Sequence, residues 1–539
     1  MRKFNCLYVL LLSLFFSTLV YSAEKSKKEA PPIQLPGVTI MGEEKDIFWD
    51  TGEKTESIKE DTHDVLKLLP WGIREKEATF SILDIKREPN ISGPEEGKKY
   101  ILGLSLVIGN YYYYMADVIH GGENNNSNYL INYNFMHDRG ERKNSTLERH
   151  KILLDISHKF AENKFINTYG RYTSNDIEMP GEKDNPLINR SRKLDDMFVL
   201  LNWEKKKSGD EYVIIGGFWN GQNLDERNVS ADKNNNVGIE CNYADIYENP
   251  MKFLFRLSNN EYLTTEPAAI YEIGMEMDVN KLIENFNLQL GVLYTNYNYK
   301  NIDAQVSPNL ELSYKIKKDF TLDAGIKQEF PIPVFGELYN NYYSAINPER
   351  LHPEKIWNYQ FGFKNRIFYD VNIGMHLYEK DIEDKIVLDE ESSGLWMPKN
   401  MGELIKIKGV NVDMNLPVSI KTKLKTSYVY ADIDVPGSNK KAPLIPVHNL
   451  NLMLTFMGKW ANFDLTGKYT GERYSDKDIT GKKFDMDSYF LWGAKIYRDW
   501  GKNFSGFASG ENLSEIGYEE VKGYPLHKMR AKIGVTWKF

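Results

Sequence analysis

The sequence contains little cysteine and only one long apolar run, and both features narrow the class of protein. Its 539 residues include two cysteines, Cys6 and Cys241. Because Cys6 lies in an amino-terminal segment that we expect to be removed, Cys241 would stand alone in the mature chain. This excludes an internal disulfide and a cysteine-based metal cage. Beyond the amino terminus, no stretch is apolar enough for a transmembrane helix.

Catalytic signatures are absent as well. The sequence has no His-Glu-x-x-His, no phosphate-binding Gly-x4-Gly-Lys-[Ser/Thr] and no Cys-x-x-Cys. Asp232 to Asn236 imitate the first half of a calcium loop, but Val237 occupies the glycine position and Tyr243 the position of the closing glutamate. The net charge is -8 with acids and bases interspersed, so no nucleic-acid partner is indicated. We therefore expect no enzyme, no cofactor and no metal site.

The last stretch, Met529 to Phe539, shows what is present instead. Apolar residues alternate without exception with polar or small ones: Met529, Ala531, Ile533, Val535, Trp537 and Phe539 against Lys528, Arg530, Lys532, Gly534, Thr536 and Lys538. Period-two alternation predicts a β-strand with one apolar face. Two kinds of sheet fit it, namely a soluble antiparallel sheet with one wet face and a transmembrane barrel with a polar lumen.

The barrel is favoured because the strand is long enough to cross a bilayer at barrel tilt. A soluble sandwich that ended on so apolar an edge strand would invite aggregation. The sequence stops on an aromatic residue, and Trp537 with Phe539 resembles the assembly signal that the barrel assembly machinery of the bacterial outer membrane reads. Mean hydropathy, at -0.51, does not discriminate, because half of each barrel strand faces water.

The amino-terminal hundred residues differ from the rest. Residues 1–22 combine a basic start, an apolar core and small residues at the end, which predicts a secretory signal peptide; an uncleaved anchor is the alternative. Residues 23–98 are charged and proline-containing, and only Val65 to Ile73 and Thr79 to Ile85 look able to bury side chains. We expect a short periplasmic, plug-like segment there, followed by a barrel over residues 99–539.

From residue 99 onward the chain reads as about 22 strands joined by alternately short and long connections, which predicts an all-β transmembrane antiparallel barrel. Leu450, Leu452 and Leu454, for example, alternate with Asn449 and Asn451. Short periplasmic turns and long external loops are the usual asymmetry of such barrels. The 13% aromatic content suits interfacial girdles facing the outer-membrane lipid.

Specific segments of this region resemble the TonB-dependent receptors, the outer-membrane active transporters for siderophores, cobalamin and some sugars. The resemblance is carried, in the order that the family uses, by Phe330-Pro331, Glu337-Leu338-Tyr339, Asn347 to Glu354, Lys380-Asp381-Ile382, Asn400-Met401-Gly402, Gly409-Val410, Glu511-Asn512-Leu513 and Gly523-Tyr524-Pro525. It covers about residues 99–539. It implies a bacterial outer-membrane barrel that imports a small molecule.

The amino-terminal region follows this family only in part. Gln34 to Ile40 is similar to the energy-coupling segment, which makes Pro36, Val38, Thr39 and Ile40 candidate contacts for the TonB protein. Asp64 to Ile73 resembles the start of a plug domain and Ser81 to Pro89 its last strand, but the middle of a plug is missing. Either a shortened plug partly fills the lumen or the pore is open.

Candidate ligand-binding residues lie on an external loop and on the lumen wall. Tyr339, Tyr342 and Tyr343 could line a ligand vestibule, because aromatic faces give contact area at low entropy cost; interfacial or loop packing is the alternative. His376 alternates onto the lumen side and could contact a metal chelate, although a lone histidine is more often a polar wall residue.

Three functions are compatible with these observations. The first is energy-coupled import of a scarce ligand such as a siderophore, a metal chelate or cobalamin. The second is passive, porin-like diffusion through a barrel without a working plug, and the third is adhesion through the long loops. A barrel fold does not imply one cargo, so the sequence leaves the ligand open.

Overall fold

The computed structural model describes residues 100–539 except 124–125, 179–190, 207–211, 227–229, 245–250, 263–267, 279–284, 299–303, 331–351, 368–370, 393–394, 401, 435–444, 475–485, 502 and 522–523. Within these residues no helix is long and apolar enough to cross a membrane. The signal peptide expected at 1–22 and the plug-like segment expected at 23–98 lie outside the described residues and remain predictions.

The described chain consists of strands. The first eleven are β1 (Tyr100–Gly109), β2 (Tyr114–Glu123), β3 (Ser127–Asp138), β4 (Leu147–Ala161), β5 (Lys164–Glu178), β6 (Ser191–Lys206), β7 (Tyr212–Glu226), β8 (Ser230–Ala244), β9 (Met251–Tyr262), β10 (Ala268–Asp278) and β11 (Phe286–Asn298). The others are β12 (Gln305–Lys317), β13 (Phe320–Glu329), β14 (Lys355–Ile367), β15 (Val371–Glu383), β16 (Ile386–Ser392), β17 (Leu395–Asn400), β18 (Ile405–Ser419), β19 (Thr422–Asp434), β20 (His448–Met457), β21 (Asn462–Thr470), β22 (Tyr489–Trp500), β23 (Phe504–Glu511), β24 (Glu519–Val521), β25 (Tyr524–Pro525) and β26 (Arg530–Lys538).

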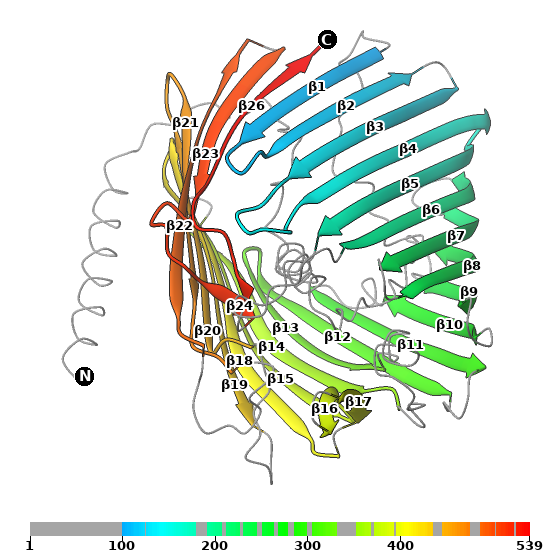
Figure 1. Cartoon of the computed structure of the whole chain (residues 1–539). Coiled ribbons are helices and arrows are strands. Elements are labelled where there is room, and N and C mark those ends of the chain that lie inside the picture. The colour runs from blue at the N-terminus through cyan, green and yellow to red at the C-terminus, as the bar shows by residue number, and fades with distance from the viewer. Residues whose placement is uncertain are drawn as a thin grey trace, which may run out of the picture.

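Among the described residues, 22 of these strands form one sheet that closes on itself. Each strand pairs antiparallel with its neighbour along the chain, and β1 pairs both with β2 and with β26, where Leu104 lies opposite Trp537. Figure 1 shows the ring of tilted strands, with blue β1 beside red β26. Closure leaves no unpaired edge, which removes the aggregation risk of an apolar sheet. The prediction of an all-β antiparallel barrel is confirmed.

The two faces of the sheet have the polarity that the alternation in β26 predicts. Ile533 and Trp537 are exposed on the outer face at 60% and 50%, whereas Gly534 and Thr536 between them are buried. The Thr536 hydroxyl shares a hydrogen bond of 2.9 Å with that of Ser105 on β1, and both side chains are buried. The outside is thus apolar and the inner wall polar.

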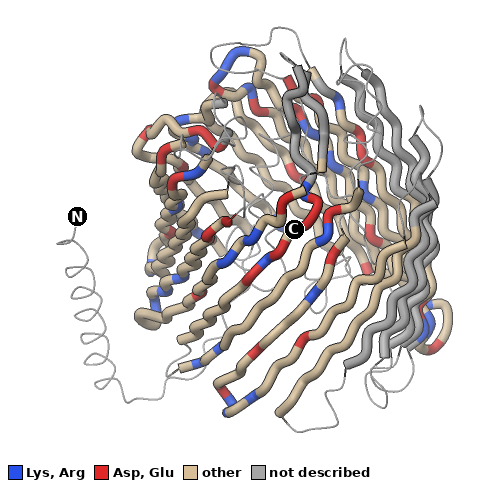
Figure 2. Tube along the Cα trace, turned by 90° about the horizontal axis from the view of Figure 1, so that it is seen from below, with Lys and Arg blue, Asp and Glu red and all other residues tan. Residues whose placement is uncertain are grey.

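Hydrogen-bonded ladders of polar side chains run across the inner wall. Asn167 on β5 accepts a hydrogen bond from Ser157 (2.6 Å) and donates one to Asn202 (2.9 Å), which links three strands. Arg171 and Asp196 form an ion pair of 2.8 Å nearby. Figure 2 shows that basic and acidic residues are interspersed around the ring. Such a wall suits a hydrated lumen or a polar occupant.

The connections differ between the two ends of the barrel. Residues 318–319 and 420–421 form tight turns at one end, whereas 330–354 and 384–404 are long connections at the other. The second of these long connections carries the β16–β17 hairpin, and the last one, 512–529, carries β24 and β25. We refer to the end with the long connections as the external end and to the opposite one as the periplasmic end, following the usual asymmetry.

Candidate ligand-binding site at the external end

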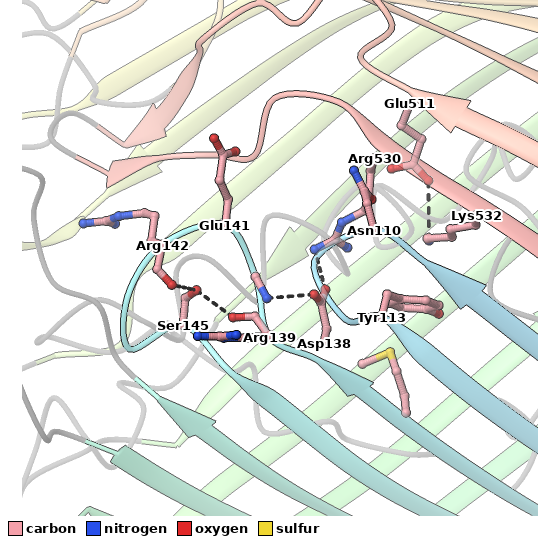
Figure 3. A network of polar contacts seen from close by, with 12 residues as sticks. Asn110, Tyr113, Asp138, Arg139, Glu141, Arg142, Ser145, Glu511, Arg530 and Lys532 are labelled. Carbon is pink, nitrogen blue, oxygen red and sulfur yellow. Dashed lines mark hydrogen bonds and ion pairs between the residues drawn. The ribbon is translucent and has the colours of Figure 1, made fainter.

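Charged side chains join the two ends of the barrel sheet at its external end. Asp138, at the end of β3, forms an ion pair with Arg530, at the start of β26, and also accepts a hydrogen bond of 2.9 Å from the Gly140 amide. Beside this pair, Lys532 lies 3.5 Å from Glu511 on β23 (Figure 3). Asp138 is 6% exposed, so the Arg530 partner offsets the cost of burying its charge.

The first two external turns are tied to the last external connection. The Asn110 side chain donates a hydrogen bond to the Met529 carbonyl (2.7 Å) and accepts one from the Ala531 amide (3.0 Å). The Lys528 amide donates a hydrogen bond of 2.9 Å to Glu141, which lies in the turn between β3 and β4. These contacts span the closure of the barrel, so residues 110–113, 139–146 and 526–532 form one block, which we call the seam block.

The tip of the first turn has an unusual backbone. Tyr111 and Tyr112 both have positive φ, 57° and 56°, and the Tyr113 amide donates to the Asn110 carbonyl at 3.1 Å. Two-residue hairpin turns of this kind favour Asn-Gly, and tyrosine there is strained. Tyr112 is 69% exposed, with the Arg139 guanidinium 5.2 Å from its ring centre. Partial burial, together with the nearby Glu141 carboxylate, raises the pKa of Tyr111.

His527, in the last external connection, has a pKa well below the usual value for histidine. Desolvation by burial, together with the nearby Arg530 guanidinium, lowers its pKa from 6.5 to about 4. Both effects penalise the protonated ring. The imidazole is therefore neutral at physiological pH, and it takes up a proton only as the pH approaches 4.

A second cluster fixes the bases of the two longest external connections. The Asn400 amide donates to the carbonyls of His352 (3.0 Å) and Asp384 (2.7 Å), and its oxygen accepts from the His352 amide at 2.8 Å. Glu354, which is 2% exposed, pairs with Lys385 at 3.2 Å. These residues, which we call the loop-base cluster, join the 330–354 and 384–404 connections.

The last external connection is held at the mouth of the lumen by contacts to β21 and β22. Glu520 pairs with Lys468 on β21 at 3.4 Å, and the Tyr518 and Tyr489 rings lie 4.8 Å apart. Arg473, which is 2% exposed, donates to the Glu519 carbonyl, and its guanidinium lies 5.4 Å from the Tyr489 ring. We call these residues the mouth cluster.

Asn512 organises the same connection from its start. Its side-chain amide donates to the Ile516 carbonyl (2.8 Å), and its oxygen accepts from the Ile516 amide (3.1 Å). It adopts a positive φ of 46° and is 5% exposed. This gives a physical reason for the Glu511-Asn512-Leu513 motif, because an asparagine tolerates this backbone and satisfies the loop's own polar groups.

The residues predicted as sites fall in different places. His376 lies on the inner wall of β15, and its Nε2 is 2.8 Å from Asp323 on β13. The ring lies over Gly362, where any larger residue would collide with it. Tyr339, Tyr342 and Tyr343, and the coupling residues Pro36, Val38, Thr39 and Ile40, lie outside the described residues. Their roles remain predictions. Trp537 and Phe539 stack on the outer face with ring centres 5.4 Å apart.

No group of three or more metal-binding side chains occurs among the described residues. What the structure adds are the seam block, the loop-base cluster and the mouth cluster, none of which we predicted. A signal was present for the loop-base cluster, because Asn400 and Glu354 belong to the motifs that carry the family resemblance. The side-chain contacts that give these residues their roles are not encoded in any local pattern.

A closed barrel with a polar lumen and side chains that anchor its external connections defines a bacterial outer-membrane barrel of the receptor and transporter class. Residues 96–513 match the family model described as "TonB dependent receptor-like, beta-barrel". The chain belongs to this family, and its location is the bacterial outer membrane.

Solved structures of this class have the same fold. The copper transporter OprC is 14% identical with a TM-score of 0.68, over 82% of this chain and 80% of that one. The siderophore receptor PirA from Pseudomonas aeruginosa is 13% identical with a TM-score of 0.65, over 82% of this chain and 81% of that one. The ferric citrate transporter FecA is 14% identical with a TM-score of 0.66, over 82% of this chain and 78% of that one. At these identities the likeness concerns the fold.

Proposed function

We propose that this protein imports a scarce small molecule, such as a siderophore, a metal chelate or cobalamin, across the outer membrane, driven by the TonB energy-coupling protein. The observation that carries the proposal is the construction of the external end. Three clusters anchor external connections above a polar-walled lumen, which is how a receptor would hold a binding surface in place. The similar structures include a copper transporter, a siderophore receptor and a ferric citrate transporter, which supports a metal-related cargo.

The proposed roles follow from position. Tyr339, Tyr342 and Tyr343, in the connection that the loop-base cluster anchors, supply ligand contacts. His376, held by Asp323 on the lumen wall, supplies a further contact along the lumen. Residues 23–98 act as the shortened plug, and Pro36, Val38, Thr39 and Ile40 bind the coupling protein. No bond of the cargo is made or broken, so the protein is not an enzyme.

Deletion of residues 35–41 tests the coupling. We expect cells carrying the deletion to bind cargo at their surface as the intact protein does, but to lose uptake, because binding resides in the barrel and energy enters through the deleted segment. Cargo-dependent growth and binding of labelled cargo separate the two effects. Unchanged uptake would contradict energy coupling.

A passive channel is the second candidate, and the short amino-terminal region favours it. Residues 23–98 lack the middle of a plug, so a lumen that they do not close would conduct ions continuously. Adhesion through the long connections is a third candidate, for which the polar lumen would have no purpose.

A further inference from the structure

An aromatic row occupies the outer surface of the barrel at its periplasmic end. Trp500 and Phe504 lie 5.2 Å apart, Phe504 and Trp537 5.8 Å, and Trp537 and Phe539 5.4 Å. The row belongs to β22, β23 and β26 and the residue that follows β26. Its members Trp500, Trp537 and Phe539 are 49%, 50% and 54% exposed, as outward-facing residues in contact with lipid would be. Trp and Tyr belts mark the depth at which hydrocarbon meets headgroups.

One cation lies between two indoles at the end of this row. The Arg498 guanidinium is 5.6 Å from the ring centre of Trp460 and 6.0 Å from that of Trp500. By the period of β22, Arg498 shares the outer face with Ile496 and Trp500, which are 50% and 49% exposed. It is two residues from the periplasmic end of the strand. Both ring contacts are cation–π interactions, which orient the guanidinium without neutralising it.

A glycine on the neighbouring strand leaves room for this arrangement of Arg498 and Trp500. Arg498 lies opposite Gly506 on β23. A Cβ atom at Gly506 would lie 2.8 Å from Cζ3 of Trp500 and 3.2 Å from Cη2. The Trp500 indole therefore lies over Gly506, and a side chain at residue 506 would displace the indole from this place beside Arg498. In the described part of the chain, Arg498 makes no ion pair with a carboxylate.

Two further cations stand on the same rim. Lys459 directly precedes Trp460 in the turn between β20 and β21, and both are exposed, Trp460 at 76%. Lys421 is exposed in the adjacent turn, between β18 and β19. The Lys421 carbonyl accepts a hydrogen bond of 2.7 Å from the Met457 amide. The hydrogen bond keeps the two turns side by side. Arg498, near the end of β22, and Lys459 and Lys421, in the two preceding periplasmic turns, are thus successive cations along this end of the barrel, and we call them the basic rim.

We propose that this rim binds the phosphate of an anionic phospholipid in the periplasmic leaflet of the outer membrane. The guanidinium offers paired N–H donors that match a phosphate, and its planar orientation is fixed in advance by the two indoles. The lysines add charge at headgroup depth, and the aromatic row packs against the glycerol and upper acyl region. A lipid fits better than a dissolved anion, because the site lies on the apolar outer face rather than in the lumen.

Native mass spectrometry of the purified full-length protein in micelles tests the site, with phosphatidylglycerol or phosphatidylcholine as the probe. We expect the intact protein to retain phosphatidylglycerol preferentially and Arg498→Gln to reduce that retention about fivefold or more, the effect of one basic residue near an anionic surface. Lys318→Gln is the matched control. Lys318 is an exposed cation of the β12–β13 turn at the same end, without indoles.

Two further variants keep the test decisive. Trp460→Leu removes one of the two rings from an exposed turn, where it should not affect folding, and we expect it to weaken retention too. Gly506→Ala displaces Trp500 and should do the same, while the unheated gel mobility of all variants checks that the barrel is folded. Excess inorganic phosphate should not compete. The proposal is wrong if Arg498→Gln retains the lipid like the intact protein, if Lys318→Gln loses it equally, or if phosphate displaces it.

Discussion

At the scale of single residues, the Asp138–Arg530 pair is one of the more buried ion pairs in the described part of the chain. Its partners come from β3 and β26, and their side chains are 8% and 18% exposed. Removing one partner from a buried pair leaves an uncompensated charge, at a cost of about 3–5 kcal/mol. An exposed pair, in contrast, contributes at most about 1 kcal/mol.

We therefore expect Asp138→Asn to lower the temperature at which the folded barrel converts to the unfolded form on heat-modifiability gels, because Arg530 loses its counter-charge. Lys355→Gln is the control, since Lys355 pairs with Glu383 at 3.1 Å but the two side chains are 36% and 46% exposed. If both substitutions shift the transition equally, the seam pair does not have the role assigned to it.

His527 makes stability depend on pH. Its folded-state pKa of about 4 lies below the unfolded value of 6.5, so between these values the unfolded chain binds more protons. Stability contributed by the neutral ring is complete above pH 6.5 and is lost as the pH falls toward 4, by at most about 3 kcal/mol. We expect His527→Gln to flatten the pH dependence of the thermal midpoint between pH 7 and 4.5. An unchanged profile would contradict this account.

At the scale of elements, a few side chains hold the described bases of the two longest external connections together. Asn400 makes three hydrogen bonds to the backbone of two connections, and each net hydrogen bond contributes about 0.5–1.5 kcal/mol. We expect Asn400→Ala to speed amide exchange of His352, Glu354, Asp384 and Lys385 without unfolding the barrel.

Asn503→Ala provides the comparison at the opposite end. Asn503 donates a single hydrogen bond of 2.8 Å to the Lys538 carbonyl, next to a short turn. Its loss should change exchange only near residues 503 and 538. If Asn400→Ala leaves exchange in both external connections unaltered, the loop-base cluster does not anchor them.

The sequence predicts the local features of the strands and connections, but not the contacts between distant ones. The alternation in β26 determines which side chains face lipid, because a strand has a fixed period of two. The alternation of short and long connections likewise assigns the two ends. The pairing of Asp138 with Arg530, 392 residues apart, follows from closure of the ring and from register, which no local pattern contains. The same reason hid the mouth cluster, in which Arg473 and Lys468 contact residues 519 and 520 of a connection about 50 residues further along the chain.

At the scale of the whole molecule, the closed barrel, its polar wall and its membership of the TonB-dependent receptor-like family agree with the import hypothesis. His376 pairs with Asp323 on the neighbouring part of the inner wall, and its contact with a ligand remains a prediction. Ligand contacts by Tyr339, Tyr342 and Tyr343 and coupling through Pro36 to Ile40 remain predictions, because those residues lie outside the described chain. The central claim is that residues 23–98 gate the lumen.

Single-channel conductance in a planar bilayer tests that claim most directly, with the full-length protein compared with a version lacking residues 24–97. Gated import predicts that the full-length protein is closed and that the truncated one conducts steadily, because the amino-terminal segment would block the polar-walled lumen. Equal, steady conductance of both proteins would contradict the account and make the barrel a diffusion pore.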